Sequence, residues 1–167
     1  MSSNNLKKII FILPKYLFFK FNLRARLLLY EIKLYIYCLE NKCQISMTSN
    51  LTGDLSRISV GNGTVINSYA NFRFKKGKIK IGKECLFGQH VTIIANTYKI
   101  TNGRVISKSI MYSKEVSIGD NVWVGANVVV MPGISIGSNA IIASSAVVTK
   151  DVPSGQIWGG VPAKKIG

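Results

Sequence analysis

An apolar residue recurs every six positions through most of the chain. The residue that follows it is glycine in six of the twelve repeats, and the residue four places on is small or aliphatic except at Lys76. Six residues make one short strand and a turn, and three such units close a triangular coil whose apolar side chains stack at the ~4.8 Å spacing of paired strands. The pattern therefore predicts an all-β solenoid. The repeated apolar positions are Val60, Ile66, Phe72, Ile81, Phe87, Ile93, Ile118, Val124, Val130, Ile136, Ile142 and Val148.

The repeat also predicts where each coil begins and turns. Successive coils fall at 60–77, 81–98, 118–135 and 136–153, and Ile45 and Leu51 start a rudimentary one. Glycine at the second position, and Asn or Gly at the fourth, tolerate a positive φ, so we expect both at the corners of the coil. The fourth-position residues are Gly63, Asn96, Asn121, Asn127, Gly133 and Asn139.

Two interruptions break the repeat. Lys78–Lys80 is a slip of three residues, and Lys99–Ser117 is a long insertion without the repeat. Long loops that leave a regular scaffold are usually functional. We therefore expect one long protruding loop at about 99–117, with the functional site near its two roots.

The N-terminal segment is a different kind of sequence. Residues 1–42 carry eight Lys and Arg against two Glu, interleaved with apolar patches, and no uncharged apolar run approaches the ~20 residues of a spanning helix. The pattern indicates two helical pieces with a break near Pro14. Residues 1–44 are interpreted as a basic amphipathic helical cap on the open end of the β domain, 45–167. A compatible alternative is a helix that lies on an anionic membrane through residues 1–42.

Charge and the rarest side chains narrow the function classes. The 22 Lys and Arg exceed the 7 Asp and Glu by 15, which calls for an anionic partner such as a phospholipid surface or a phosphorylated cofactor. Three cysteines without a CxxC pattern favour a reducing cytoplasm. The single histidine, His90, excludes a zinc site built from three histidines of one chain. We expect neither a metal nor a nucleic-acid partner.

The C-terminal third carries a specific resemblance. The segment IGDNVWVGANVVVMPG, the run VVTKDVP and the closing GGVPAK resemble hexapeptide-repeat acetyltransferases, in the branch of maltose, galactoside and polysaccharide O-acetyltransferases. The resemblance covers about residues 60–167. It implies a left-handed parallel β-helix, a homotrimer, and acetyl-CoA as donor in the groove between neighbouring subunits.

The resemblance also implies the donor contacts. By matching motif positions, these fall on Ala126, Ser144, Thr149, Lys150 and Lys164. Anionic phosphates of CoA need cations and backbone N–H donors, which suits the lysines, although solvated surface lysines are the alternative.

Trp123 ends its hexad. It is expected to point outward beside the loop root, where related polysaccharide acetyltransferases use a tryptophan near the acyl group. An exposed tryptophan at the edge of the core is the alternative.

The chain departs from the family at the general base, the residue that removes the proton of the acceptor hydroxyl. The family histidine before the long loop is replaced by Tyr98 in the hexad IIANTY. A phenol has an ordinary pKa of ~10 and is a poor base at pH 7, unless cations such as Lys99, Arg104, Lys108 or Lys114 fold over it. His90 lies fourth in its hexad and is interpreted as a turn residue. Three alternatives stay open: His90 substitutes as base, Tyr98 acts with a lowered pKa, or chemistry is slow.

The sequence therefore predicts an acetyl-CoA-dependent O-acetyltransferase. Its acceptor would be a carbohydrate or lipid-linked glycan precursor of a surface polysaccharide, and its place the cytoplasm, with peripheral contact to the membrane. The alternative is a catalytically impaired hexapeptide-repeat subunit that binds CoA or sugar and has an assembly role. Tyr98 is the main argument for that alternative.

Overall fold

The structure is a computed structural model that describes residues 29–98, 100–102, 104–105 and 111–167. The chain divides into two compact units, Met1–Tyr37 and Cys38–Gly167. A helix covers 29–41. The predicted break near Pro14 lies outside the described residues. Within them, no helix has the length and apolar character to cross a membrane.

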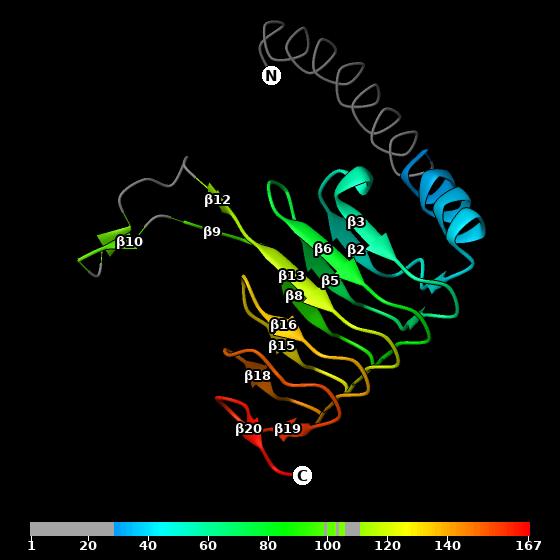
Figure 1. Cartoon of the computed structure of the whole chain (residues 1–167). Coiled ribbons are helices and arrows are strands. Elements are labelled where there is room, and N and C mark those ends of the chain that lie inside the picture. The colour runs from blue at the N-terminus through cyan, green and yellow to red at the C-terminus, as the bar shows by residue number, and fades with distance from the viewer. Residues whose placement is uncertain (1–28, 99, 103, 106–110) are drawn as a thin grey trace, which may run out of the picture. The chain divides into compact units, whose positions relative to one another are not determined.

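Residues 44–167 wind through three parallel sheets in a fixed rotation (Figure 1). We call them sheets A, B and C in the order in which the chain meets them. Sheet A contains β1 (Gln44–Ile45), β4 (Val65–Ile66), β7 (Leu86–Phe87), β14 (Trp123–Val124), β17 (Ile141–Ile142) and β19 (Ile157–Gly159), with β20 (Lys164–Lys165) antiparallel at its end. Sheet B contains β2 (Asn50–Thr52), β5 (Asn71–Arg73), β8 (Thr92–Ile94), β15 (Val129–Val130) and β18 (Val147–Val148). Sheet C contains β3 (Ile58–Val60), β6 (Lys78–Ile81), β13 (Glu115–Ile118) and β16 (Ser135–Ile136).

The inner stacking follows the six-residue repeat. All twelve repeated apolar residues are buried, and so are Ile45 and Leu51, which begin the first coil as predicted. Each residue pairs with its counterpart one coil away, for example Val124 with Phe87 and with Ile142. The rings of Phe72 and Phe87 meet edge to face with centroids 6.1 Å apart. The core is therefore a column of aliphatic and aromatic side chains enclosed by three sheets.

The coils are not all of one length, which corrects the predicted boundaries. Partners are 21 residues apart in the first coils, as for Ile45 with Ile66, and 18 apart further on, as for Val124 with Ile142. The predicted three-residue slip at Lys78–Lys80 is confirmed as a shift of register, because Val60 pairs with Ile81 at 21 residues instead of 18. These residues are nevertheless not a break in the sheet, since they begin β6. Ile79 within it points inward and pairs with Ile58 and Val116. The additional residues widen the corner before that strand.

The repeat predicted positive φ at its second and fourth positions, and the corners confirm this only for the fourth. The fourth position has positive φ at nine residues of the described chain: Gly63, Tyr69, Glu84, His90, Asn121, Asn127, Gly133, Asn139 and Ser145. Asn96 was expected among them but lies in a strand. The second-position glycines do not have positive φ. A Cβ on Gly125 would lie 2.6 Å from the backbone nitrogen of Ser144, so close stacking of coils explains glycine there.

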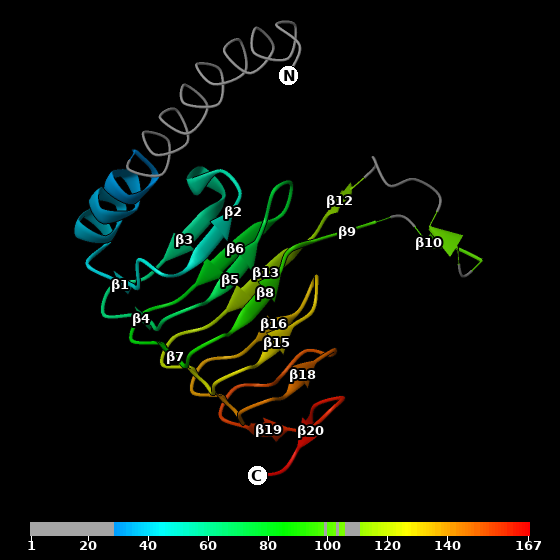
Figure 2. The same cartoon turned by 180° about the vertical axis from the view of Figure 1, so that it is seen from behind.

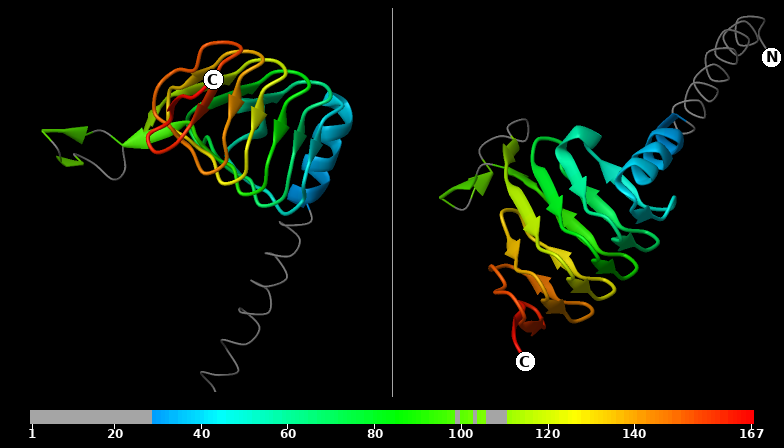
Figure 3. Two further views of the ribbon diagram at one scale, coloured as in Figure 1. Left: turned by 90° about the horizontal axis from the view of Figure 1, so that it is seen from below. Right: turned by 45° about the vertical axis from the view of Figure 1, so that its right-hand side comes forward.

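The insertion leaves the coils at one corner (Figures 1 and 2). Strand β9 (Asn96–Tyr98) pairs antiparallel with β12 (Met111–Ser113), and β10 (Ile100–Thr101) pairs with β11 (Arg104–Val105) further out. We call 96–113 the excursion; Figure 3 shows its strands projecting from the coils. The protruding segment therefore begins and ends earlier than the predicted 99–117, since Glu115–Ser117 already belong to sheet C.

Candidate active site

Three predicted site residues share the corner between sheets A and B. Ala126 and Ser144 occupy equivalent turn positions in successive coils, and the backbone N–H of Ser145 donates to the carbonyl of Ala126 at 2.8 Å. His90 lies in the preceding coil, where the N–H of Asn127 donates to the carbonyl of Gln89 at 2.9 Å. Ala126 and Ser144 have short side chains and Gly125 has none, so a ligand can approach the backbone at this part of the corner. Ala126 and Ser144 thus lie at a corner and not on the face of a sheet.

His90 has the geometry of a turn residue. Its φ is 58°, in the left-handed region, and its ring stacks on that of Tyr69 with centroids 4.9 Å apart and an interplanar angle of 14°. Both rings are exposed to solvent. The turn interpretation is confirmed, and it places the single imidazole of the chain one coil from Ala126.

Three more predicted residues lie at the corner between sheets B and C: Tyr98, Thr149 and Lys150. Thr149 and Lys150 follow β18 and are exposed there. Tyr98 ends β9 at the root of the excursion, where 43% of its surface is exposed, and it pairs with Met111. Of the cations considered as its neighbours, Lys99 and Lys108 lie outside the described residues. The structure therefore divides these predicted residues into two clusters, one at each of the two corners that flank sheet B.

Trp123 lies apart from both clusters. It starts β14 in sheet A, and the excursion leaves between sheets B and C, the corner opposite that sheet. The outward direction of Trp123 was predicted correctly, since 54% of its surface is exposed. The predicted position beside the root of the loop is not found in the single chain, because the root lies at a different corner. It stands in an outward column of sheet A formed by Gln44, Val65, Leu86, Trp123, Ile141 and Ile157.

Lys164 lies at the C-terminal end of the same sheet. It belongs to β20, which pairs antiparallel with β19, and its side chain is exposed. Two residues before it, the Val161–Pro162 peptide bond is cis. Lys164 is therefore in the tail, as predicted. The residue before it, Ala163, donates its N–H to the carbonyl of Val147 at 2.8 Å, beside the corner that carries Ser144.

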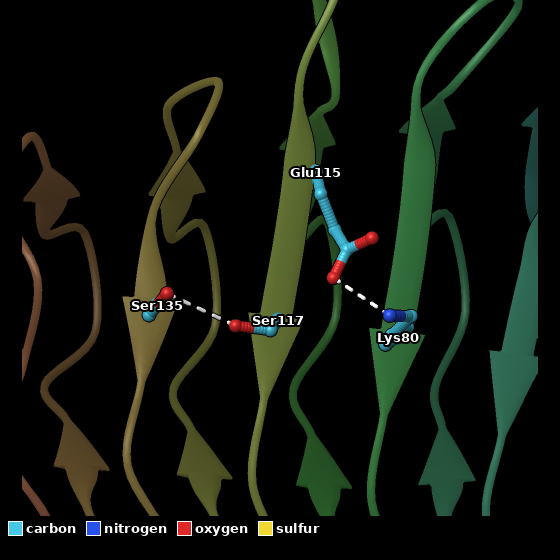
Figure 4. Close-up of polar contacts among 4 residues, drawn as sticks. All are labelled: Lys80, Glu115, Ser117 and Ser135. Carbon is cyan, nitrogen blue, oxygen red and sulfur yellow. Dashed lines mark hydrogen bonds and ion pairs between the residues drawn. The ribbon is translucent and has the colours of Figure 1, made fainter.

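Sheet C presents a polar outer surface, in contrast with sheet A. Lys80 forms an ion pair with Glu115 at 2.9 Å, and the hydroxyl of Ser117 donates to that of Ser135 at 3.0 Å (Figure 4). A shallow hollow of about 490 Å³ extends from these serines to Asp151 and Ser154. The outer face of sheet C is thus suited to solvent, and the outer face of sheet A is not.

Asn96 was missed as a site residue because the repeat made it a corner residue. It is buried in β9 at the base of the excursion, and its Oδ1 has no hydrogen-bond partner among the described residues. An unsatisfied buried acceptor costs about 1–3 kcal/mol. In the sequence Asn96 fits the column of Asn and Gly at the corners, so no signal distinguished it from a turn residue.

Buried thiols are not candidates for a covalent intermediate. Burial, followed by the neighbouring Cys38, raises the pKa of Cys43 to about 12. Burial likewise raises the pKa of the Cys85 thiol. Because the thiolate is the nucleophile, both side chains stay unreactive near neutral pH. Within the described ranges no three His, Cys, Asp or Glu side chains gather to hold a metal ion.

Known proteins share this arrangement of parallel coils. Residues 115–150 match the family described as bacterial transferase hexapeptide (six repeats). A maltose O-acetyltransferase from Clostridium difficile 630 is 31% identical, with 77% of this chain and 71% of that chain covered and a TM-score of 0.59. Among curated proteins, none matches the chain. The chain belongs to the hexapeptide-repeat acetyltransferase family.

Two further solved structures bear on ligands. A hexapeptide-repeat-containing acetyltransferase from Vibrio cholerae O1 biovar eltor, complexed with acetyl coenzyme A, is 30% identical with a TM-score of 0.62; 66% of this chain and 60% of that chain are covered. The polySia-specific acetyltransferase NeuO is 31% identical with a TM-score of 0.56, and 74% and 60% are covered. The chain thus spans somewhat less than two thirds of the length of these two proteins.

Proposed function

We propose that the protein is an acetyl-CoA-dependent O-acetyltransferase that acts on a glycan. The observation that carries this proposal is the placement of the predicted donor residues at the two edges of sheet B, Ala126 and Ser144 at one and Thr149 and Lys150 at the other. One relative is complexed with acetyl coenzyme A, and another is a maltose O-acetyltransferase. We include in this proposal the left-handed winding that the family resemblance implies.

A homotrimer is part of the proposal, because one chain leaves the donor residues in two separate clusters. If neighbouring subunits face each other across a groove, the corner with Ala126 and His90 of one subunit meets the corner with Lys150 and Tyr98 of the next. The outward column of sheet A supports such an assembly, since Leu86 and Trp123 are exposed apolar side chains in one continuous stripe. Contiguous exposed apolar surface marks protein interfaces.

The reaction transfers the acetyl group to a hydroxyl. The oxygen of the sugar hydroxyl attacks the thioester carbonyl, a C–O bond forms, the C–S bond breaks, and the hydroxyl proton passes to a base. That proton, or an equivalent one from solvent, then reaches the CoA thiolate. His90 and Tyr98 are the candidate bases from the two corners, and general-base catalysis is worth about 10²–10⁴ in rate. Lys150 and Lys164 would hold the CoA phosphates.

The acceptor is proposed to be a carbohydrate or lipid-linked glycan precursor of a surface polysaccharide, encountered in the cytoplasm at the membrane surface. The described helix supports membrane contact. Its apolar residues Leu29, Ile32, Ile36 and Leu39 recur at helical spacing and are exposed. The basic residues that would meet an anionic bilayer come from residues 1–42 as a whole, which carry eight Lys and Arg against two Glu. The described helix itself contributes Lys33 against Glu31 and Glu40. The helical cap formed by residues 1–44 remains a prediction.

The test is release of free CoA thiol from acetyl-CoA in the presence of glycans, with three variants. If His90 is the base, His90→Ala abolishes turnover and keeps CoA binding. If Tyr98 is the base, Tyr98→Phe abolishes turnover and Tyr98→His retains it. If Tyr98 only contacts the acceptor, Tyr98→Phe costs little and Tyr98→His raises turnover by about 10-fold or more. Binding of CoA without turnover on any glycan contradicts the proposal and favours a binding subunit with an assembly role.

A further inference from the structure

Cations line a hollow at the corner between sheets B and C, on the N-terminal side of the excursion. The hollow measures about 220 Å³ and is lined by Arg57, Lys76, Gly77, Lys78, Ser113, Lys114 and Glu115. Its residues come from three successive coils and from the last strand of the excursion. Four basic side chains therefore converge where the excursion returns to the coils.

The carboxylate in this hollow does not neutralise the four cations. Glu115 forms an ion pair with Lys80, whose ammonium lies 2.9 Å from its carboxylate oxygen on the outer face of sheet C (Figure 4). Lys76, Lys78 and Lys114 have no acidic partner among the described residues. A concave surface lined by charges of one sign concentrates counter-ions of the opposite sign.

The backbone holds the cations in place. The carbonyl of Lys76 accepts a hydrogen bond from the Arg57 guanidinium at 3.4 Å, and the N–H of Lys78 donates to the carbonyl of Lys114 at 3.1 Å. Gly77 is buried between them, and a Cβ there would lie 2.5 Å from the carbonyl oxygen of Lys114. A glycine at this position lets the coils and the base of the excursion close on each other, which brings the basic side chains together.

The position of the hollow separates it from the predicted donor residues. Lys114 and Lys150 stand at the same corner, two coils apart, which corresponds to roughly 10 Å along the stack. Thr149, Lys150 and Ser144 lie toward the C-terminal end, and Arg57 and Lys78 toward the N-terminal end, with Tyr98 at the intervening root of the excursion. The phosphates of the donor and an anionic group of the acceptor thus have different cationic partners.

We propose that this hollow binds a carboxylate or phosphate group of the acceptor, so that the substrate is an anionic glycan. The inference rests on the proposed function and names the substrate class of the same site. The anionic group docks among Lys76, Lys78 and Lys114, and the hydroxyl to be acetylated lies farther along the corner, toward the donor.

Binding of hexagalacturonate, compared with maltohexaose of the same length, tests the proposal. We expect the full chain to bind the anionic hexasaccharide at least 10-fold more tightly, with an affinity that falls as salt rises. The double variant Lys78→Gln with Lys114→Gln should lose most of this preference and keep its affinity for CoA. Lys83→Gln, an exposed lysine at another corner, should change neither. Lys76→Gln provides a second variant if the double variant fails to fold.

Three outcomes overturn the inference: equal affinity for the two hexasaccharides, an equal loss in Lys83→Gln, or a loss of CoA affinity in the double variant, which would assign the hollow to the donor. Failure of the proposed function looks different. Selective binding of hexagalacturonate without acetyl transfer to any glycan contradicts the transferase and leaves the anion site. Acetyl transfer to maltohexaose without selective binding of hexagalacturonate supports the transferase and contradicts the anion site.

Discussion

The ring of His90 stacks nearly parallel on the ring of Tyr69 in the preceding coil, with centroids 4.9 Å apart. Both residues have positive φ, 58° and 63°, at the same position of the repeat. Two side chains that rarely adopt this backbone region are thus brought together by the stacking of coils. The pair continues the corner that carries Ala126 and Ser144, so the imidazole belongs to the candidate site by position.

The corner geometry predicts which substitutions His90 tolerates. His90→Asn should retain the fold and lose about 0.5–1.5 kcal/mol of aromatic stacking, because Asn127 holds the same position one coil on. His90→Val should cost about 1–2 kcal/mol more, since a β-branched residue resists this region. Urea unfolding measures both changes. Equal destabilisation by Asn and Val contradicts the conformational argument.

Gly77 is expected to be the most sensitive glycine near the excursion. Gly77→Ala places a Cβ against the carbonyl oxygens of Ala95 and Lys114, and should destabilise the protein by about 1–3 kcal/mol while displacing the excursion. Gly155→Ala is the matched control, because its Cβ meets nothing within 4 Å and only its φ of 71° is unfavourable. Unfolding and acetyl transfer should be measured together. A loss of activity in Gly155→Ala as large as in Gly77→Ala contradicts the prediction.

The outward column of sheet A predicts the subunit interface. Trp123→Lys should convert the proposed trimer to monomers, because a charge replaces the most exposed of the large apolar side chains in that column. Ser135→Lys adds the same charge to the outer face of sheet C and should leave assembly unchanged. Light scattering of both variants checks the expectation. A trimeric Trp123→Lys would exclude this face as the interface.

The buried Cys43 predicts a loss of stability in alkali. Its pKa is raised to about 12 by burial and by Cys38, so the unfolded chain releases the thiol proton first as pH rises. The stabilisation is fully present below the ordinary thiol pKa of about 8.5 and is lost as pH rises toward 12. Unfolding free energies from pH 8 to 11 should fall less steeply in Cys43→Ala. Identical slopes in both proteins rule out a contribution of Cys43.

The exposed apolar stripe of the helix and the eight Lys and Arg of residues 1–42 together predict binding to anionic vesicles. The intact protein should sediment with vesicles that contain phosphatidylserine and not with phosphatidylcholine alone, and added salt should release it. Ile32→Ser with Ile36→Ser should weaken binding, while Met47→Ser, an equally exposed apolar residue in the first coil, should not. Sedimentation with both vesicle types to the same extent would show that charge does not drive the contact.

The six-residue period predicted the inner column because each repeat is one short strand and one turn of constant length. An inward-pointing side chain therefore recurs every six residues. The period also located the three additional residues at Lys78–Lys80, but it did not predict which side chains of the widened corner are buried. Phe74 and Ile79 are both buried, yet neither falls on the repeat, since the coil gains residues there. A template of constant period has no means of orienting the residues that enlarge a corner.

The candidate site was predictable only in part. Motif positions nominated Ala126, Ser144 and Lys150 as donor contacts, which stays a prediction, but they gave no sign that these residues stand on opposite sides of sheet B. The position of Trp123 could not be read from the sequence, because nearness in the chain does not say which of three sheets a strand joins. Arg57 and Lys114 are far apart in sequence and meet only through the stacking of coils.

The excursion is closed at its base by the peptide groups of Ala95 and Lys114. The N–H of Lys114 donates to the carbonyl of Ala95 at 2.9 Å, so the chain returns to the coils where it left them. Because this hydrogen bond joins the two ends of the excursion, the part of the chain beyond Tyr98 can change in length without disturbing the column of buried side chains. The coils, and the basic residues Lys76, Lys78 and Lys114 with them, can therefore keep their places while the outer part of the excursion varies.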